Sequence, residues 1–145
     1  MTNDEAKQIL KYHSFLHENP NEPKMTTGFL GALRPFQGTL TDDNFHEIMK
    51  CLKVLANEFE NNIIEQEVVS ALWGICHYSR AWALYNNGML QRNNLLTQEQ
   101  IEILDIWICM ISYAVTWLLE GNVEEAFFEY NEYLSERNTK HIWTK

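Results

Sequence analysis

The chain has 145 residues, of which 46% are hydrophobic and 21% are charged, and its 20 acidic and 11 basic residues give a net charge of −9. This length suits one domain with its own core, and the composition excludes a disordered tail, a collagen-like repeat and a disulfide scaffold. A surface of that sign repels nucleic-acid phosphates and anionic lipids, so we expect neither nucleic acid nor a membrane as a partner.

The first predicted helix covers residues 3–18. Thr2 and Glu5 have the spacing of a capping box, and four residues recur at helical spacing: Ile9, Tyr12, His13 and Leu16. The polar first residues lack the basic and apolar segments of a secretory signal, so we expect a cytoplasmic protein.

Residues 19–41 form the one long irregular segment, because all three prolines and three of the six glycines fall within it. Disorder is not expected here, since the segment also carries Phe29, Leu30, Leu33 and Phe36. We expect these side chains to pin the segment to the rest of the fold, with the glycines allowing the turns.

Four longer helices are predicted after this segment, over residues 42–60, 63–86, 98–120 and 123–137, followed by a tail at 138–145. Their expected N-caps are Thr41, Asn62, Thr97 and Asn122. Gly88 and Gly121 are expected to end the second and third of them in the left-handed conformation.

These elements predict an all-α, single-domain bundle of about five helices. No stretch shows the sustained two-residue alternation of a strand. Four long helices should pack in a mostly antiparallel bundle, with the N-terminal helix and the ordered Pro/Gly-rich loop laid over it. The longest uncharged apolar run, 106–119, is too short to span a bilayer and is typical of a core helix. Three cysteines lie in helical apolar stretches and are expected to be reduced core thiols: Cys51, Cys76 and Cys109.

The net charge is concentrated in the C-terminal half. Residues 93–136 contain nine acidic residues and no Lys or Arg, whereas the rest of the chain has eleven of each sign. On the last helix, one stripe carries Glu125, Glu129, Glu132 and Glu136, with Phe128 outside the inner face. This stripe is either a solvated face neutralised by the chain's own Lys and Arg, or a surface that binds a basic protein.

A second candidate site is a pocket for a small anionic or nucleotide-like ligand. It would combine Arg34 of the irregular segment with Trp73, His77 and Arg80, which share one line along the third helix. The sequence alone does not bring Arg34 to the other three. The structural alternative is that the segment around Arg34 only covers the core.

Metal binding and catalysis have little support in the sequence. His13 and His17 have a spacing compatible with a metal, but we interpret them as surface or boundary histidines, and Asp43 with His46 lacks a second matching motif. Cys76 and His77 are consecutive and point about 100° apart on a helix. Without a nucleophile elbow or a phosphate-binding glycine loop, we expect no enzymatic activity, no metal and no cofactor.

The functional hypothesis is therefore a non-enzymatic interaction protein, of the immunity or antitoxin type, that neutralises a basic nuclease-like toxin through its acidic helix. This is an analogy to a functional class and not to a fold. The alternatives are the small-anion pocket and, third, a structural or regulatory homodimer that uses an exposed aromatic face.

Overall fold

The computed structural model describes the backbone of residues 1–143 and the side chains of residues 1–136. Its elements in chain order are α1 (Asn3–His13), α2 (Lys24–Thr27), α3 (Asp43–Glu60), α4 (Gln66–Ser79), the π-helical turn η1 (Arg80–Leu84), α5 (Met89–Arg92), α6 (Gln98–Leu119), α7 (Val123–Ala126) and α8 (Phe128–Trp143). Residues 1–143 contain no β-strand, and the prediction of an all-α, single-domain bundle is confirmed.

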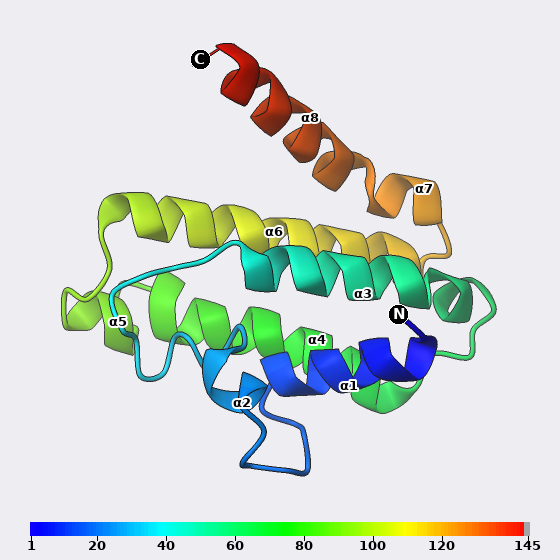
Figure 1. The fold of residues 1–145 in the computed structure, drawn as a ribbon, viewed down its shortest axis with the longest axis horizontal. Coiled ribbons are helices and arrows are strands. Elements are labelled where there is room, and N and C mark those ends of the chain that lie inside the picture. The colour runs from blue at the N-terminus through cyan, green and yellow to red at the C-terminus, as the bar shows by residue number, and fades with distance from the viewer. Residues whose placement is uncertain (144–145) are drawn as a thin grey trace.

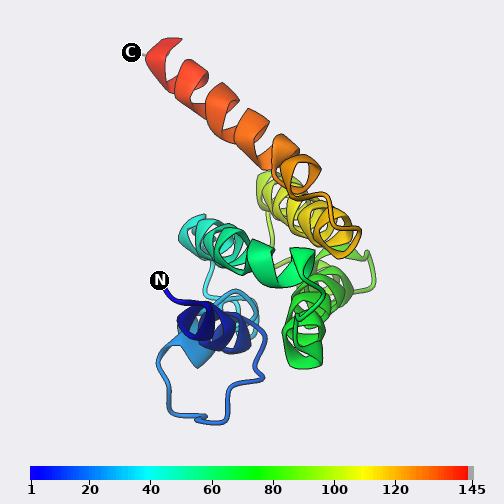
Figure 2. The ribbon, with the colours of Figure 1, turned by 90° about the vertical axis from the view of Figure 1, so that its right-hand side faces the viewer.

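Four helices surround the core. α1 contacts α3, α3 contacts α6, α6 contacts α4, and α4 closes the ring against α1. The consecutive long helices α3, α4 and α6 alternate in direction, whereas α8 leads diagonally away from the bundle (Figures 1 and 2). The prediction had placed the last helix in the bundle and α1 over it. The two exchange roles because α1 buries Ala6 and Leu10 completely, while Tyr130 is the only buried side chain among those described in α8.

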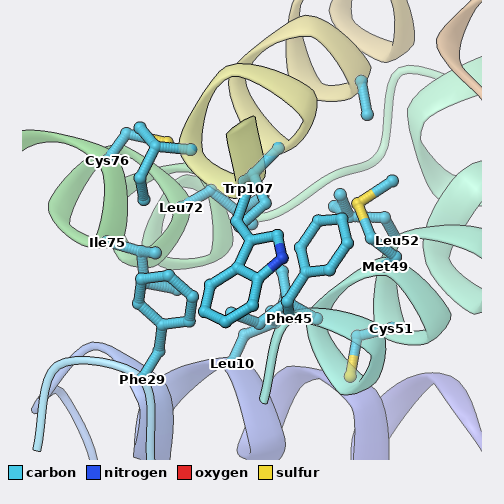
Figure 3. Close-up of a cluster of buried hydrophobic side chains, with 14 of the residues drawn as sticks. Leu10, Phe29, Phe45, Met49, Cys51, Leu52, Leu72, Ile75, Cys76 and Trp107 are labelled. Atoms are coloured by element: carbon cyan, nitrogen blue, oxygen red, sulfur yellow. The ribbon is translucent and has the colours of Figure 1, made fainter. Parts of the chain in front are cut away.

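The core is centred on Trp107 of α6, as Figure 3 shows. The ring of Phe45 from α3 stacks on Trp107 with centroids 5.8 Å apart, and Phe29 meets it edge-on at 6.5 Å. Phe29, Leu30 and Leu33 are buried, so the segment between α1 and α3 supplies core side chains as the sequence predicts.

Two of the predicted N-caps form complete capping boxes. The Thr2 and Thr97 hydroxyls accept from the backbone N–H of Glu5 and Gln100, and both side chains at the third position return the bond. The Asn122 side chain accepts from the N–H of Glu125. At α3 the prediction of Thr41 as N-cap is wrong by one residue, because Asp42 occupies that position, although the Thr41 hydroxyl still accepts from the N–H of Asp43 at 3.3 Å.

Several helices end in a left-handed residue, and the N–H of the residue after it donates to the carbonyl five residues back, which is the Schellman arrangement. Leu16 N–H donates to Lys11 O at 3.0 Å across Phe15 (φ 63), so α1 ends at His13 and the prediction of a helix to residue 18 is wrong. Ile63 N–H donates to Glu58 O in the same way across Asn62 (φ 56). Asn62 therefore ends α3 and does not open the next helix, which begins only at Gln66.

The predicted single helix over 63–86 changes character at Arg80. Tyr85 N–H donates to Arg80 O at 2.9 Å, five residues back, which makes η1 a π-helical turn. Gly88 was predicted to be left-handed, but its φ is −64° and it precedes α5. A glycine is still required there, because a Cβ would lie 2.6 Å from Ala81 O.

A buried polar cluster joins the irregular segment to two bundle helices. The fully buried His13 accepts a hydrogen bond from Phe29 N–H at its Nδ1 (2.8 Å) and donates from Nε2 to Glu47 at 2.8 Å. Lys24 Nζ lies 2.7 Å from both oxygens of the same carboxylate. The hydrogen bond from His13, together with Lys24, lowers the pKa of Glu47 to about 2. The interpretation of His13 as a surface or boundary residue is therefore wrong.

By length and composition alone, α6 is long and apolar enough to cross a membrane. Core helices meet the same criterion, and α6 packs one face against α3 and α4. That face is fully or almost fully buried and carries Leu104, Trp107, Ile108, Ile111, Ala114 and Leu118.

Candidate functional site

The acidic surface, defined as the side chains of Glu125, Glu129, Glu132 and Glu136, is divided between two helices. α7 ends at Ala126, and Phe127 (φ −104°, ψ 5°) departs from helical geometry before α8 begins, which corrects the predicted single helix over 123–137. α8 then continues to Trp143, through most of the predicted tail. Glu125 is half-buried on α7, whereas the three glutamates of α8 are exposed.

The acidic surface has apolar neighbours. Phe128 is 56% exposed next to Glu129. The charge of Glu129 acts on Tyr113 and Cys109 of α6, so α8 adjoins the outer face of that helix. Ile106 lies on the same face and is also exposed. Exposed aromatic and aliphatic side chains beside charges are typical of protein interfaces.

Glu125 is tied to the bundle. Its carboxylate accepts a hydrogen bond from the hydroxyl of Tyr113. This bond raises the pKa of Tyr113, and burial and the charge of Glu129 act in the same direction. Glu125 therefore belongs to the α6–α7 contact and is less available to a partner than the three glutamates of α8.

The ion pairs between described residues lie away from the acidic surface. Every ion pair between described residues has its acidic member within residues 42–67: Lys7 with Glu58 and Glu65, Lys11 with Glu67, His13 and Lys24 with Glu47, and His46 with Asp42. None of these pairs includes an acid from residues 99–136. Among the described side chains, the acidic surface therefore forms no ion pair, and the two interpretations of the stripe both stay predictions.

Lys53 is the lysine of α3 that lies against the start of α8. Its ammonium group sits 5.5 Å from the ring centroid of Phe127 and 5.2 Å from that of Tyr130, and it donates to Asn131 Oδ1 at 3.5 Å. These cation–π contacts help to hold the inner face of α8 on α3. Tyr130 adds a hydrogen bond to His46 Nδ1 at 2.7 Å.

The second candidate site is brought together in part. Trp73, His77 and Arg80 line one groove between α4 and α6, which we call the α4–α6 groove. From α4 and the residue after η1, it also receives Val69, Leu72, Cys76 and Tyr85, and from α6 it receives Ser112, Val115, Thr116 and Leu119. Its volume is about 300 Å³.

Arg34 does not belong to this groove. Its guanidinium lies over the ring of Trp82, 5.3 Å from the centroid, at a site defined by η1 and the irregular segment. Phe29 of the irregular segment is buried in the core, and no residue of this segment lines the groove between α4 and α6. The predicted four-residue pocket is therefore corrected to three residues of α4 and η1.

Tyr85 and Ser112 are groove residues that the sequence did not indicate. Ser112 is separated from Arg80 by 32 residues, yet its hydroxyl accepts a hydrogen bond from Arg80 Nη2 at 3.2 Å. The wide turn of η1 carries Tyr85 to the groove. The signal that the sequence offered for Ser112 is a hydroxyl residue within the apolar run 106–119, which suggests a polar partner on a neighbouring helix.

Nucleophilic and metal chemistry are not favoured by the described side chains. Cys76 is buried and its pKa is raised to about 11 by burial, so its thiol stays protonated next to the exposed His77. Cys109 is exposed, which corrects its expected place in the core. No three His, Cys, Asp or Glu residues among those described cluster in a way that could hold a metal ion, and both ring nitrogens of His13 already have hydrogen-bond partners.

Comparisons of the chain with models of protein families, with curated proteins and with solved structures find no match.

Proposed function

We propose that this protein is a non-enzymatic interaction protein that binds a basic protein through the acidic surface and Phe128. The observation that carries the proposal is that Glu129, Glu132 and Glu136 are exposed and that none of them forms an ion pair with another described residue. Like charges three and four residues apart oppose helix formation by a few tenths of a kcal/mol per pair. A basic partner would replace this repulsion with charge-assisted hydrogen bonds.

The specific form of the proposal is an immunity or antitoxin-type inhibitor. A nuclease active site is cationic because it must hold phosphates, so a carboxylate-rich helix with an apolar anchor is complementary to it. α8 leads away from the bundle (Figure 2), and the three glutamates on this helix are exposed. We place this function in the cytoplasm, where the free thiols of Cys51, Cys76 and Cys109 remain reduced.

Charge reversal on α8 tests the proposal. The immobilised protein is used to capture interacting proteins from the source cell, and captured proteins are identified and ranked by isoelectric point. Glu129→Lys with Glu132→Lys should abolish capture of a basic protein without lowering thermal stability, because both side chains are exposed.

The matched control reverses two other exposed glutamates. Glu18→Lys with Glu60→Lys makes the same change in net charge outside α8 and should leave capture intact. Equal loss of capture by both double variants would mean that only net charge matters. Unchanged capture by the α8 variant would overturn the proposal.

A further inference from the structure

The α4–α6 groove has a polar end and an apolar end. α4 and α6 run in opposite directions (Figure 1). The hydrogen bond between Arg80 and Ser112 shows that these two residues lie at the same level along the groove. Eleven residues separate Arg80 from Val69, which is about 16 Å along a helix. Leu119 lies seven residues beyond Ser112, about 10 Å along α6 in the same direction in space, so Leu119 and Val69 both line the apolar end. Trp73 borders the groove and is 74% exposed.

Arg80 has unused hydrogen-bonding capacity. A guanidinium offers five N–H donors in a planar fork that matches a carboxylate. The one side-chain hydrogen bond that the described residues give Arg80 goes to the neutral hydroxyl of Ser112. The Ser112 hydroxyl in turn donates to Ile108 O at 2.8 Å, which keeps an oxygen lone pair directed at the guanidinium.

The groove itself supplies no anion to Arg80. Burial raises the pKa of Cys76, so that thiol is neutral at physiological pH. Glu102 and Asp105 line a neighbouring depression that shares Arg80 and Tyr85 with the groove, and neither carboxylate forms an ion pair with Arg80. Arg80 is therefore a half-buried cation at one end of an apolar channel, on a protein whose net charge is −9.

We propose that the α4–α6 groove binds a small amphipathic carboxylate, with its carboxylate on Arg80 and its apolar body along Leu72, Trp73, Val115 and Leu119. The volume of about 300 Å³ is at the lower end of the range for small-molecule sites, which matches a medium-chain or single-ring acid. This proposal does not depend on the acidic surface.

Decanoate at submicellar concentration is a suitable probe, and decylammonium with the same chain is its matched control. Titrations are followed in ¹H–¹⁵N spectra by the indole N–H of Trp73, with the indole of Trp117, which does not line the groove, as an internal reference. We expect saturable shifts of Trp73 with decanoate and at least tenfold weaker binding of decylammonium.

Three variants test the assignment. Arg80→Gln should weaken decanoate binding about tenfold or more, whereas Arg92→Gln, an exposed arginine in α5, should leave it unchanged. Thr116→Trp fills the middle of the groove without touching Arg80 and should also abolish binding. It keeps the proposal testable if Arg80→Gln fails to fold.

Absence of a saturable Trp73 shift would overturn the proposal. Equal binding of decanoate and decylammonium, or unchanged binding by a folded Arg80→Gln or Thr116→Trp variant, would overturn it as well. None of these results bears on capture of a basic partner, so the two proposals fail separately.

Discussion

At the residue scale, Glu47 carries more of the structure than its position suggests. Its carboxylate accepts hydrogen bonds from His13 of α1 and Lys24 of α2, and it lies on α3, so a single side chain joins three elements. The sequence could not show this, because Glu47 is 34 residues from His13 and the helical pattern around His13 is equally compatible with an exposed ring. Burial of a histidine depends on a partner that only the folded chain brings to it.

Glu47→Gln should lower the free energy of unfolding by about 1–3 kcal/mol at pH 7, because it removes a charged acceptor from a buried donor. The pKa of Glu47 is lowered from 4.5 to about 2 in the folded protein, so its ionised form stabilises folding fully above pH 4.5. That contribution is lost as the pH falls towards 2. Urea unfolding at pH 7 and at pH 3 should therefore show a smaller gap between wild type and variant at the lower pH.

Glu60→Gln is the control for this prediction, since Glu60 is exposed at the end of α3 and forms no ion pair with another described residue. It should leave stability nearly unchanged at both pH values. A gap for Glu47→Gln that stays constant from pH 7 to pH 3 would contradict the role assigned to the ionised carboxylate.

At the scale of the elements, helix starts were easier to predict than helix ends. The boxes at Thr2 and Thr97 depend on side chains three positions apart and are readable from the sequence. Phe15 and Asn62 end their helices in the left-handed conformation without a glycine, so the usual signal is missing. The change of direction at Phe127 likewise has no proline or glycine to mark it. It follows from the rings of Phe127 and Tyr130 both reaching Lys53.

Asn62→Gly should stabilise the protein by about 0.5–1 kcal/mol. The residue has φ 56° in the Schellman end of α3, where glycine has no Cβ penalty. Lys50→Gly, in the exposed interior of α3, should instead destabilise by about 0.5–1 kcal/mol. Chemical denaturation of both variants gives the comparison, and loss of stability in both would show that residue 62 does not need the left-handed conformation.

At the scale of the whole molecule, charge is segregated along the chain. The count of acidic and basic residues along the sequence shows this division directly. Helical spacing also placed Trp73, His77 and Arg80 on one line of a helix. It could not exclude Arg34, because the irregular segment takes its course from the core contacts of Phe29 and Leu33. The exchange of α1 for the last helix in the bundle was equally hidden, because helical spacing shows which face of a helix is apolar and not which helices it packs against.

Added salt should raise the melting temperature of this protein by about 2 °C or more between 10 and 200 mM NaCl. Repulsion among the acids of residues 99–136 is screened as the Debye length falls from about 30 Å to below 10 Å, while the partly buried pairs near Glu47 and Glu58 are screened less. Glu129→Gln with Glu132→Gln should raise the melting temperature at low salt and reduce its dependence on salt. A melting temperature that falls with salt would show that the ion pairs of residues 42–67 dominate.

The departure of α8 from the bundle also affects how the molecule moves in water. From Tyr130, its buried anchor, to Trp143 the helix advances about 20 Å, a length comparable to the roughly 15 Å radius of gyration of a compact chain of this size. A molecule with such an extension tumbles anisotropically. The ¹⁵N relaxation of N–H bonds parallel to the α8 axis should therefore give a different effective correlation time from that of N–H bonds perpendicular to it. An approaching macromolecule would meet this arm at a larger capture radius than that of the bundle alone.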